Sequence, residues 1–331
     1  MIIQLKVDRL TIEKFKNTRV LVLGDVMIDA YLFGKVERIS PEAPVPVVAV
    51  VHKENRLGGA ANVAVNLVAL GAKPILCSVV GNDAEGKDLI DLIKSSGIGA
   101  DGIIQSKERV TTIKTRVISQ STQMLRIDNE ITDSLNQEDD SRLISKVKEL
   151  LKEADVIIFE DYDKGVISEH LISQITQEAN ALNIPIVVDP KKRNFMSYQK
   201  ASLFKPNLKE LREGFKRDFD IDNKEEFESV CKDLMQDMGL KNLFVTLSER
   251  GVMITNGNEF YYIPAHLRKI ADVSGAGDTV ISVASLCMAL GLPLKQVAQI
   301  SNLAGGLVCE EVGVVPINKE KLIEEIESID W

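Results

Sequence analysis

The chain has 331 residues, 45% hydrophobic and 27% charged, so it can bury a sizeable core as one large or two ordinary domains. Its formal net charge of -9 argues against nucleic acid or an anionic membrane as a partner, and an anionic substrate needs local basic residues or a metal ion. Four scattered cysteines and three scattered histidines form no disulfide, zinc or catalytic-triad pattern. Without a secretory or membrane-spanning segment, we expect a cytoplasmic protein.

The predicted elements begin with an apolar run over 19–23 that ends in Gly24-Asp25, which is typical of a buried parallel strand. An alanine-rich helix over 60–70 follows and ends at Gly71. Further strands are predicted over 74–80, 156–160, 184–188, 203–205 and 243–247, and helices over 85–95, 137–152, 168–182, 224–238, 276–290 and 295–310. This alternation predicts an α/β fold with a mostly parallel sheet between two layers of helices.

Two stretches break this alternation, 45–53 and 111–128, where β-branched and polar residues alternate without a helix. They are typical of antiparallel strands set apart from the main sheet. We therefore expect one domain over residues 1–331 with a small β-lid over the carboxyl edge of the sheet, its segments lying at about 36–56 and 109–128.

The sequence DVSGAGD at 272–278 runs directly into an apolar helical stretch. Small residues allow close approach to a bound group, and the first N–H groups of a helix lack internal partners, which suits a phosphate or a developing oxyanion. Asp278 then lies in the first helical turn as a base beside this anion hole, an arrangement that suits phosphoryl transfer to a hydroxyl. The alternative is a glycine-rich turn with an aspartate favoured by the helix dipole.

Polar residues near the first strand are candidates for binding a sugar. Asp29 follows the strand and can accept bonds from hydroxyl groups, although a lone aspartate there is more often a turn or cap residue. Gly58-Gly59 allows close approach to a ligand, and Asn62, one turn into the helix, offers a donor and an acceptor. The glycine pair is equally compatible with a tight entry into a packed helix.

A possible magnesium site lies at Asn207 and Glu210, which share a face at a helix start and can hold waters around Mg²⁺. The alternative is an asparagine N-cap with a capping-box glutamate, and both can hold together. Lys164 and Lys191 each follow a strand and can lean over the cleft toward phosphate, although an exposed lysine is usually only solvated.

Together these motifs resemble the ribokinase-like (PfkB) carbohydrate kinase family, in order and over essentially the whole chain. GGAAN at 58–62 and DVSGAGD at 272–278 are similar to its two signatures, and NLKE at 207–210 to its N-x-x-E magnesium motif. The resemblance implies a three-layer α/β sandwich with a β-lid, ATP and Mg²⁺ as cofactors, and transfer to a sugar hydroxyl. It implies Asp278 as the catalytic base and Gly275, Ala276 and Gly277 as the anion hole.

Within that family the chain looks most like the D-glycero-β-D-manno-heptose-7-phosphate kinases. The segments that carry this likeness are 24–31, 38–47, 57–64, 161–165, 189–191 and 206–210, and the second discriminates best. The resemblance implies phosphorylation of the anomeric hydroxyl, giving the 1,7-bisphosphate, in ADP-heptose and lipopolysaccharide core synthesis. Such kinases can be fused to a nucleotidyltransferase, whose His-x-Gly-His motif we do not find, so we expect a stand-alone kinase.

The same resemblance implies further site residues. The nucleotide is framed by Thr246, Ser248, Gly251 and Asn302, with Leu208 and Lys209 inside the magnesium motif, and Asp161 joins the sugar side. A monovalent cation such as K⁺ near Asp272 and Gly313 is a further family possibility. Two residues depart from the family pattern, Ser274 in place of threonine and Glu160 in place of a small residue; the role of Glu160 is unexplained.

Two rival functions remain open at this point: a kinase for another sugar, sugar phosphate or nucleoside, and an inactive family member that serves as a sugar-sensing module. The intact Asp278, Asn207 and Glu210 count against the second.

A phosphorylated sugar needs positive charge at the cleft, and the candidates are Lys114, Arg116 and Arg126 in the second lid segment. Lys114 and Arg116 are two apart, so on a strand they share a face, although any one of them can be a solvated lid residue.

The run VPVVAVV at 45–51 lacks polar alternation, so both faces of this lid strand need cover. We expect a homodimer that pairs two lids about a two-fold axis. The alternative is that the run folds back on its own main domain.

Overall fold

The computed structural model describes residues 8–120, 122–266 and 268–329. Its strands are β1 (Arg19–Gly24), β2 (Val26–Ile39), β3 (Pro46–Gly59), β4 (Lys73–Gly81), β5 (Gly99–Ser106), β6 (Ile113–Ser119), β7 (Thr122–Asn129), β8 (Val156–Glu160), β9 (Ile186–Asp189), β10 (Leu203–Phe204), β11 (Leu243–Thr246), β12 (Val252–Thr255) and β13 (Phe260–Ile263).

The α-helices are α1 (Arg9–Glu13), α2 (Ala60–Ala69), α3 (Ala84–Ser95), α4 (Gln137–Leu151), α5 (Glu169–Ala181), α6 (Leu208–Phe215), α7 (Lys224–Met238), α8 (Ala276–Ala289), α9 (Leu294–Val308) and α10 (Lys319–Ser328). Short 3₁₀ helices cover Lys14–Asn17, Phe195–Ser197 and Ser248–Arg250.

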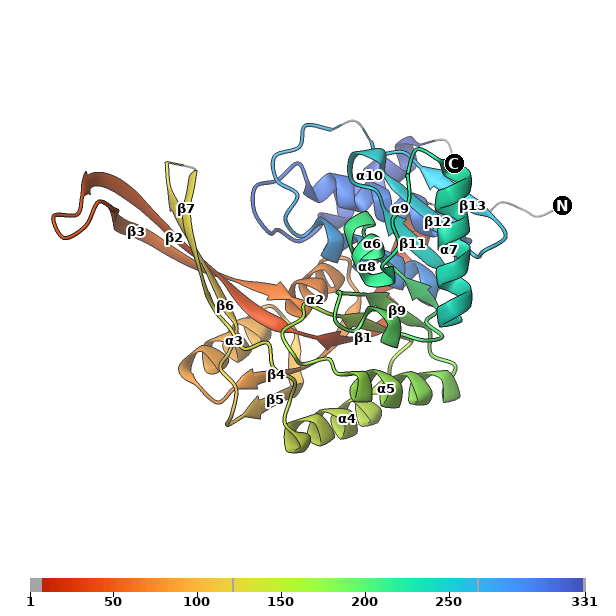
Figure 1. The fold of residues 1–331 in the computed structure, drawn as a ribbon, viewed down its shortest axis with the longest axis horizontal. Helices are drawn as coiled ribbons and strands as arrows, with labels where there is room; N and C mark the ends of the chain where they lie inside the picture. The colour runs from red at the N-terminus through yellow and green to blue at the C-terminus, as the bar shows by residue number, and fades with distance from the viewer. Residues whose placement is uncertain (1–7, 121, 267, 330–331) are drawn as a thin grey trace.

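The main sheet, counted over the described residues, has nine strands in the order β13-β12-β11-β10-β9-β8-β1-β4-β5 (Figure 1). Strands β5 to β11 of this order are parallel, and β12 and β13 add an antiparallel edge. The carboxyl ends of β1, β8 and β9 therefore meet at one sheet edge, where Gly24 pairs with Glu160 and Glu160 with Asp189. This is the edge at which open α/β sheets bind ligands.

Strand β1 explains why the sheet is covered on both faces. Val20 and Val22 belong to one buried apolar cluster, shared with α2, α8 and α9, while Leu21 and Leu23 belong to a second cluster, shared with α4, α5 and α7. Because side chains alternate along a strand, a strand buried on both faces is apolar at every position. The predicted three-layer α/β fold is confirmed, and none of the described helices is both long and apolar enough to span a bilayer.

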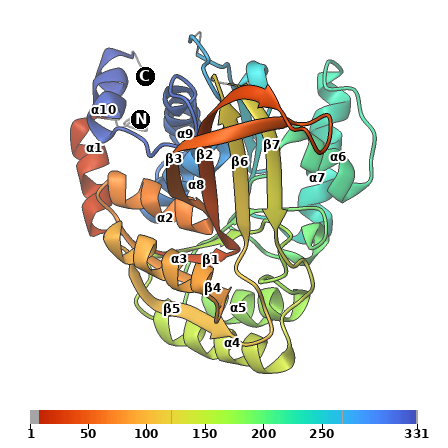
Figure 2. The same ribbon diagram turned by 90° about the vertical axis from the view of Figure 1, so that its left-hand side faces the viewer.

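The second sheet has the order β3-β2-β6-β7 within the described residues and extends away from the body of the molecule (Figures 1 and 2). It reaches further along the chain than predicted, because β2 continues almost directly from β1 and β3 runs to Gly59. The expectation of antiparallel pairing holds for β2 with β3 and for β6 with β7, but it is wrong for β2 with β6, which pair in parallel. Two separate insertions entering from the same end of the body produce this parallel pair.

Candidate active site

The loop that follows β8 is held by one buried carboxylate, Asp25. Its Oδ2 accepts bonds from the N–H groups of Tyr162 (2.9 Å) and Lys164 (3.1 Å), and its Oδ1 accepts one from Val166 (3.0 Å). Burial, together with the charge of nearby Asp161, raises the pKa of Asp25 to about 6. Asp25 thus determines the conformation of the loop over 161–166, which carries Tyr162 and Lys164 toward the site.

Asp278 lies in the first turn of α8, buried between two donors from other parts of the chain. The Asn62 Nδ2 donates to its Oδ2 (2.6 Å), and the Tyr162 hydroxyl donates to its Oδ1 (2.8 Å). Burial raises the pKa of Asp278 to about 6, although both hydrogen bonds favour the ionised form. A carboxylate with this pKa, oriented through both oxygens, is suited to accept a proton near neutral pH.

The turn before α8, predicted as an anion hole, requires glycine at its last position. Gly275 adopts φ +80°, and a side chain there would press on the Asn62 amide and on Val314. The N–H of Ala276 reaches the Val273 carbonyl at 3.3 Å, a long bond, so one of the three predicted anion-hole N–H groups has an internal acceptor in this state. The turn and Asp278 occupy the same helix start, as predicted.

The predicted sugar residues converge at the base of the lid. Asp29 lies within β2, not in a loop, and its carboxylate is ion-paired with Arg116. Gly58 has a specific steric reason to be glycine, because a Cβ there would overlap the Asp29 carboxylate. Gly59, at φ +61°, passes so close to the Asp25 carbonyl that a side chain would overlap it. Both glycines therefore serve close packing around Asp25 and Asp29.

A cluster of buried charges lies beside Asp278 at the ends of β8 and β9. Lys205 donates to Asp189 Oδ2 (2.9 Å), and Lys191 lies 3.5 Å from Asp189 Oδ1. Glu160 is almost fully buried, and its Oε2 has no hydrogen-bond partner among the described residues. Burial and the charges of Asp189 and Asp278 raise the pKa of Glu160 well above its usual range.

The predicted magnesium motif forms the start of α6. Asn207 accepts from the Glu210 N–H, Glu210 accepts from the Asn207 N–H (both 2.8 Å), and Glu210 is also ion-paired with Lys191. The capping box is therefore present. Two residues within the motif point elsewhere: Leu208 packs against the core, and Lys209 is exposed and lies 3.8 Å from Glu213.

The predicted nucleotide residues line one pocket of about 400 Å³ together with the turn before α8. The lining includes Thr246, Ser248, Gly251, Asn302, Ala276 and Gly277. The Asn302 side chain also donates to the Pro264 carbonyl (2.8 Å), which connects α9 to the segment directly after β13. The lining mixes polar residues, such as Thr246 and Ser248, with apolar ones, such as Val273 and Val280, which suits a ligand with a charged and a flat apolar part.

The suggested monovalent-cation position is a tight loop contact. Asp272 accepts from the Ser274 N–H and hydroxyl and from the Gly313 N–H (3.0 Å). Burial opposes ionisation of Asp272, but these hydrogen bonds outweigh it and lower its pKa. Arg56 of the lid donates to the neighbouring Val314 carbonyl (3.1 Å), so a protein cation lies beside this loop.

The predicted basic residues of the lid are all engaged with carboxylates. Lys114 lies between Asp128 (3.1 Å) and Glu130 (2.8 Å), and Arg126 pairs with Asp128 (2.9 Å). Lys164 pairs with the same Glu130 (2.7 Å). With Arg116, which is ion-paired with Asp29, each of these four cations has a carboxylate partner in this structure.

Asp161, predicted on the sugar side, is instead turned into the body of the fold. Its carboxylate accepts from the Tyr198 hydroxyl (2.7 Å), the Asn194 amide (3.1 Å) and the Asp163 N–H (2.9 Å). These donors leave it engaged in holding the loop, so the structure does not bring Asp161 to the site.

Several residues of the site were not assigned a role from the sequence. Tyr162 and Lys205 stand beside predicted residues, but only their buried contacts with Asp278 and Asp189 reveal them. Arg268 and His266 line the nucleotide pocket from an irregular segment. The sequence could have indicated Tyr162 and Lys205 through their positions at strand ends. It contains no comparable indication for Arg268 and His266.

Comparison with known proteins places the chain in a family. A model described as "pfkB family carbohydrate kinase" matches residues 17–321. Two curated relatives named "Bifunctional protein HldE" are 39% identical over 323 residues (Syntrophotalea carbinolica; 96% of this chain, 65% of that protein) and 40% identical over 310 residues (Methylobacillus flagellatus; 93% and 63%). The chain therefore spans about two thirds of the length of these relatives.

Among solved structures, phosphofructokinase-2 from Escherichia coli has a TM-score of 0.77 at 16% identity, covering 94% of this chain and 99% of that one. Ribokinase from Arabidopsis thaliana, solved with ribose and ATP, has a TM-score of 0.73 at 15% identity, covering 95% and 99%. These likenesses confirm the ribokinase-like fold. Together with the family match they bear out the predicted enzyme class, a sugar kinase, and the chain belongs to the pfkB family of carbohydrate kinases.

Proposed function

We propose that the chain transfers the terminal phosphoryl group of ATP to the anomeric hydroxyl of D-glycero-β-D-manno-heptose 7-phosphate, giving the 1,7-bisphosphate for ADP-heptose synthesis. The observation that carries the proposal is Asp278, buried and held by Asn62 and Tyr162, at a helix start that also borders the nucleotide pocket. The heptose substrate is supported by the six segments that resemble heptose-7-phosphate kinases and by the identity with HldE proteins.

In the proposed reaction Asp278 takes the proton of the attacking hydroxyl, since each carboxylate oxygen has a second lone pair beside the one that accepts from Asn62 or Tyr162. The N–H groups at 275–277 stabilise the charge that develops on the transferred group. Asp29, beside Gly58, accepts bonds from sugar hydroxyls. Lys191 and Lys205 supply positive charge next to the buried carboxylates at the end of β9.

Magnesium is implied by the family, and the donors present fit it. Asn207 and Glu210 provide amide and carboxylate oxygens, and Glu160 adds a buried oxygen without a partner in the described part of the chain. No group of three or more His, Cys, Asp and Glu side chains in that part is arranged to hold a metal directly. The ion would offset the negative charge of the nucleotide phosphates.

A coupled assay of ATP turnover with a sugar panel tests the function. The panel contains heptose 7-phosphate, fructose 6-phosphate, ribose and a nucleoside. We expect turnover with heptose 7-phosphate at least tenfold more efficient than with the others. If another acceptor is preferred, the chain is a different kinase of the family. If a sugar binds without turnover, the chain is a sugar-sensing module.

Replacing Glu210 with glutamine is expected to raise the Mg²⁺ concentration needed for half-maximal rate and to leave the KM for sugar nearly unchanged. The carboxylate acts on the water shell of the metal, and it lies across the cluster from the sugar residues. The matched control is Glu213→Gln, one turn later on α6 and partly exposed. A magnesium titration that superimposes on wild type, with only a lower thermal stability, would reduce Glu210 to a helix cap.

We further propose that two copies pair through the lid. The run over 45–51 does not fold back on its own body, because Val45 and Val51 are 51% and 71% exposed, and Leu125 and Ile127 on β7 are exposed as well. A lid sheet with exposed apolar residues on both edge strands needs a partner surface.

Light scattering at micromolar concentration checks this proposal. We expect a dimer mass for the wild type and a monomer mass for Val48→Asp, because a buried charge without a partner disrupts an apolar interface. Lys152→Gln, exposed on the far side of the body, is the control. A fully active wild-type monomer would end the dimer proposal.

A further inference from the structure

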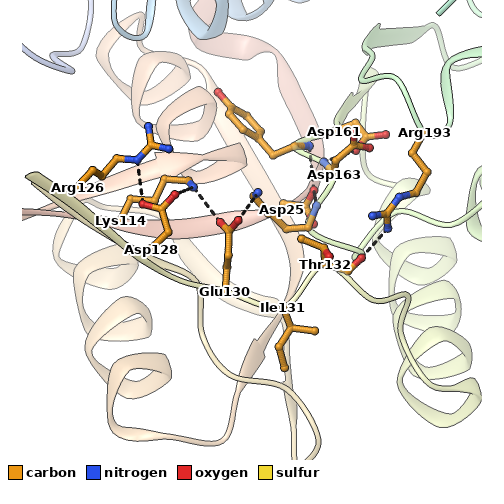
Figure 3. Close-up of polar contacts among 12 residues, drawn as sticks. Asp25, Lys114, Arg126, Asp128, Glu130, Ile131, Thr132, Asp161, Asp163 and Arg193 are labelled. Atoms are coloured by element: carbon orange, nitrogen blue, oxygen red, sulfur yellow. Dashed lines mark hydrogen bonds and ion pairs between the residues drawn. The ribbon is translucent and has the colours of Figure 1, made fainter.

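Glu130 occupies a position with no role in the mechanism above, between two lysines that approach it from different parts of the fold. The Lys114 Nζ, from lid strand β6, donates to its Oε2 (2.8 Å), and the Lys164 Nζ, from the loop after β8, donates to its Oε1 (2.7 Å) (Figure 3). Each oxygen of one carboxylate is thus held by a separate ammonium group, and all three side chains are at most 21% exposed.

The backbones of the two lysines are held independently of Glu130. The backbone of Lys164 is held on both sides, since its N–H donates to Asp25 and its carbonyl accepts from Arg109. Lys114 lies within the lid sheet, directly across from Asp29 on β2 and Asp128 on β7. Removing the Glu130 carboxylate would therefore leave two ammonium groups aimed at the same point.

Glu130 itself can leave that point. It is the first residue after β7, and the stretch from there to α4 contains no helix or strand. The backbone beyond it is anchored through the Ile131 and Asp133 carbonyls, which accept from Arg109, and the Thr132 carbonyl, which accepts from Arg193. The side chain can change rotamer while the backbone on both sides stays in place.

The place of the lysine pair relative to the catalytic base suits one end of an extended ligand. Tyr162, which contacts Asp278, is two residues from Lys164, so their Cα atoms are at most about 7 Å apart. Asp29, which we assign to sugar hydroxyls, is the cross-strand neighbour of Lys114. The lysine pair therefore lies close both to the loop that reaches the base and to the carboxylate assigned to the sugar, as a subsite for a phosphate on that sugar requires.

We propose that Lys114 and Lys164 form the subsite for the substrate's phosphate monoester, and that Glu130 occupies this subsite in the empty enzyme and is displaced when the phosphate binds. This inference rests on the proposed function. Two parallel N⁺–H···O⁻ bonds to adjacent oxygens are as suited to a phosphate as to a carboxylate, and a dianion replaces a monoanion between two cations. The two lysines also hold the pKa of Glu130 below its usual value despite burial.

The other predicted phosphate candidates are less suited. Arg116 is ion-paired with Asp29 and stacks over the Tyr31 ring, with its guanidinium carbon 5.4 Å from the ring centre. The Arg126 side chain is 52% exposed and faces Asp128. The proposed phosphate subsite is therefore the pair of Lys114 and Lys164, which joins the lid to the body, and not the predicted set of Lys114, Arg116 and Arg126.

The test compares kcat/KM for heptose 7-phosphate with kcat/KM for the same heptose without its phosphate. We expect Lys114→Gln and Lys164→Gln each to lower this ratio about 10- to 100-fold, since each loses one charge-assisted bond to phosphate. Glu130→Gln is expected to raise the ratio several-fold, because a neutral amide competes less well for the lysines. Lys152→Gln and Glu138→Gln, both exposed on or beside α4, are matched controls.

The ratio of the two kcat/KM values is expected to fall in the lysine variants and to rise in Glu130→Gln. These opposite changes distinguish a phosphate subsite from a contact that only holds the lid against the body. If Glu130 only fastened the lid, Glu130→Gln would impair both sugars by the same factor, and that result overturns the inference. Thermal unfolding of each variant shows whether it is folded. The charge-retaining variant Lys164→Arg is expected to have a ratio near that of the wild type, which would exclude misfolding as the cause of the change in Lys164→Gln. Unchanged ratios in both lysine variants would also overturn it.

Failure of the proposed function is recognised separately. If the wild type prefers another sugar phosphate, the same ratio is measured with that sugar and its dephosphorylated form. If it prefers an unphosphorylated sugar, inorganic phosphate is the probe. Inhibition by phosphate that is competitive with the sugar in the wild type, and is weaker in Lys164→Gln, supports the subsite. Inhibition that is competitive only with ATP overturns it.

Discussion

Replacing Asp278 with asparagine is expected to lower turnover by about 10²- to 10⁴-fold or more while leaving nucleotide binding intact. Asp278 is the carboxylate that the fold orients through both oxygens beside the anion-hole turn, and asparagine keeps its size without its basicity. The nucleotide pocket is lined by the neighbouring residues Ala276 and Gly277, not by the Asp278 side chain. Turnover and ATP binding are measured on the same preparation.

The pH profile distinguishes loss of a base from a general disturbance. Because the pKa of Asp278 is raised to about 6, the protonated and inactive form accumulates as pH falls through 6, and the wild-type rate should drop about tenfold per pH unit below it. An ordinary aspartate would keep the rate level down to about pH 4. The control is Asp88→Asn, exposed on α3. Near-normal turnover in Asp278→Asn at unchanged stability would remove Asp278 from the mechanism.

Replacing Asp25 with asparagine is expected to lower the free energy of unfolding by about 1–3 kcal/mol for each N–H that loses its acceptor, and to lower turnover as well. Both oxygens of Asp25 accept backbone N–H groups, and an asparagine amide presents an NH₂ to one set of them. The loop that loses its anchor carries Tyr162 to Asp278, so stability and activity should fall together.

Urea unfolding and turnover check this expectation. Asp101→Asn, exposed on β5, is the control for the same chemical change away from the loop. Tyr162→Phe separates the two effects, because it removes the contact with Asp278 and keeps the bonds that Asp25 accepts. An Asp25→Asn protein with wild-type unfolding midpoint and rate would show that the loop needs no buried acceptor.

The elements that the sequence predicts well are those with a strong local pattern. The buried strands at 19–24 and 156–160 are continuous apolar runs, and the helices at 137–151 and 224–238 have clear apolar faces and asparagine caps. The missed elements are short, although α10 also has an asparagine cap and a buried apolar face. The short antiparallel strands β12 and β13 have only four residues each, and α10 is a short, highly charged helix.

The long strand β2 was missed for a different reason. Its first residues are apolar and belong to the body, and its last residues are polar and exposed, so no single period runs along it. Strand identity here depends on pairing with β3, whose partners lie 7 to 33 residues away, as Asp29 with Arg56, and with β6, whose partners lie 85 residues away, as Gly34 with Ser119. Such pairing is a tertiary property.

What the sequence by itself determined is the fold class, the kinase family and the position of Asp278 beside its glycine turn, because these depend on local periodicity and on contiguous motifs such as 272–278. Only the tertiary structure decided which side chains share the site. It brought Tyr162 and Asn62 to opposite oxygens of Asp278, turned Asp161 away, and set Glu130 between two lysines. The physical reason is that the hydrogen bonds and ion pairs of buried groups form between side chains from distant segments of the chain. The spacing of these residues along the sequence does not predict which of them meet in the fold.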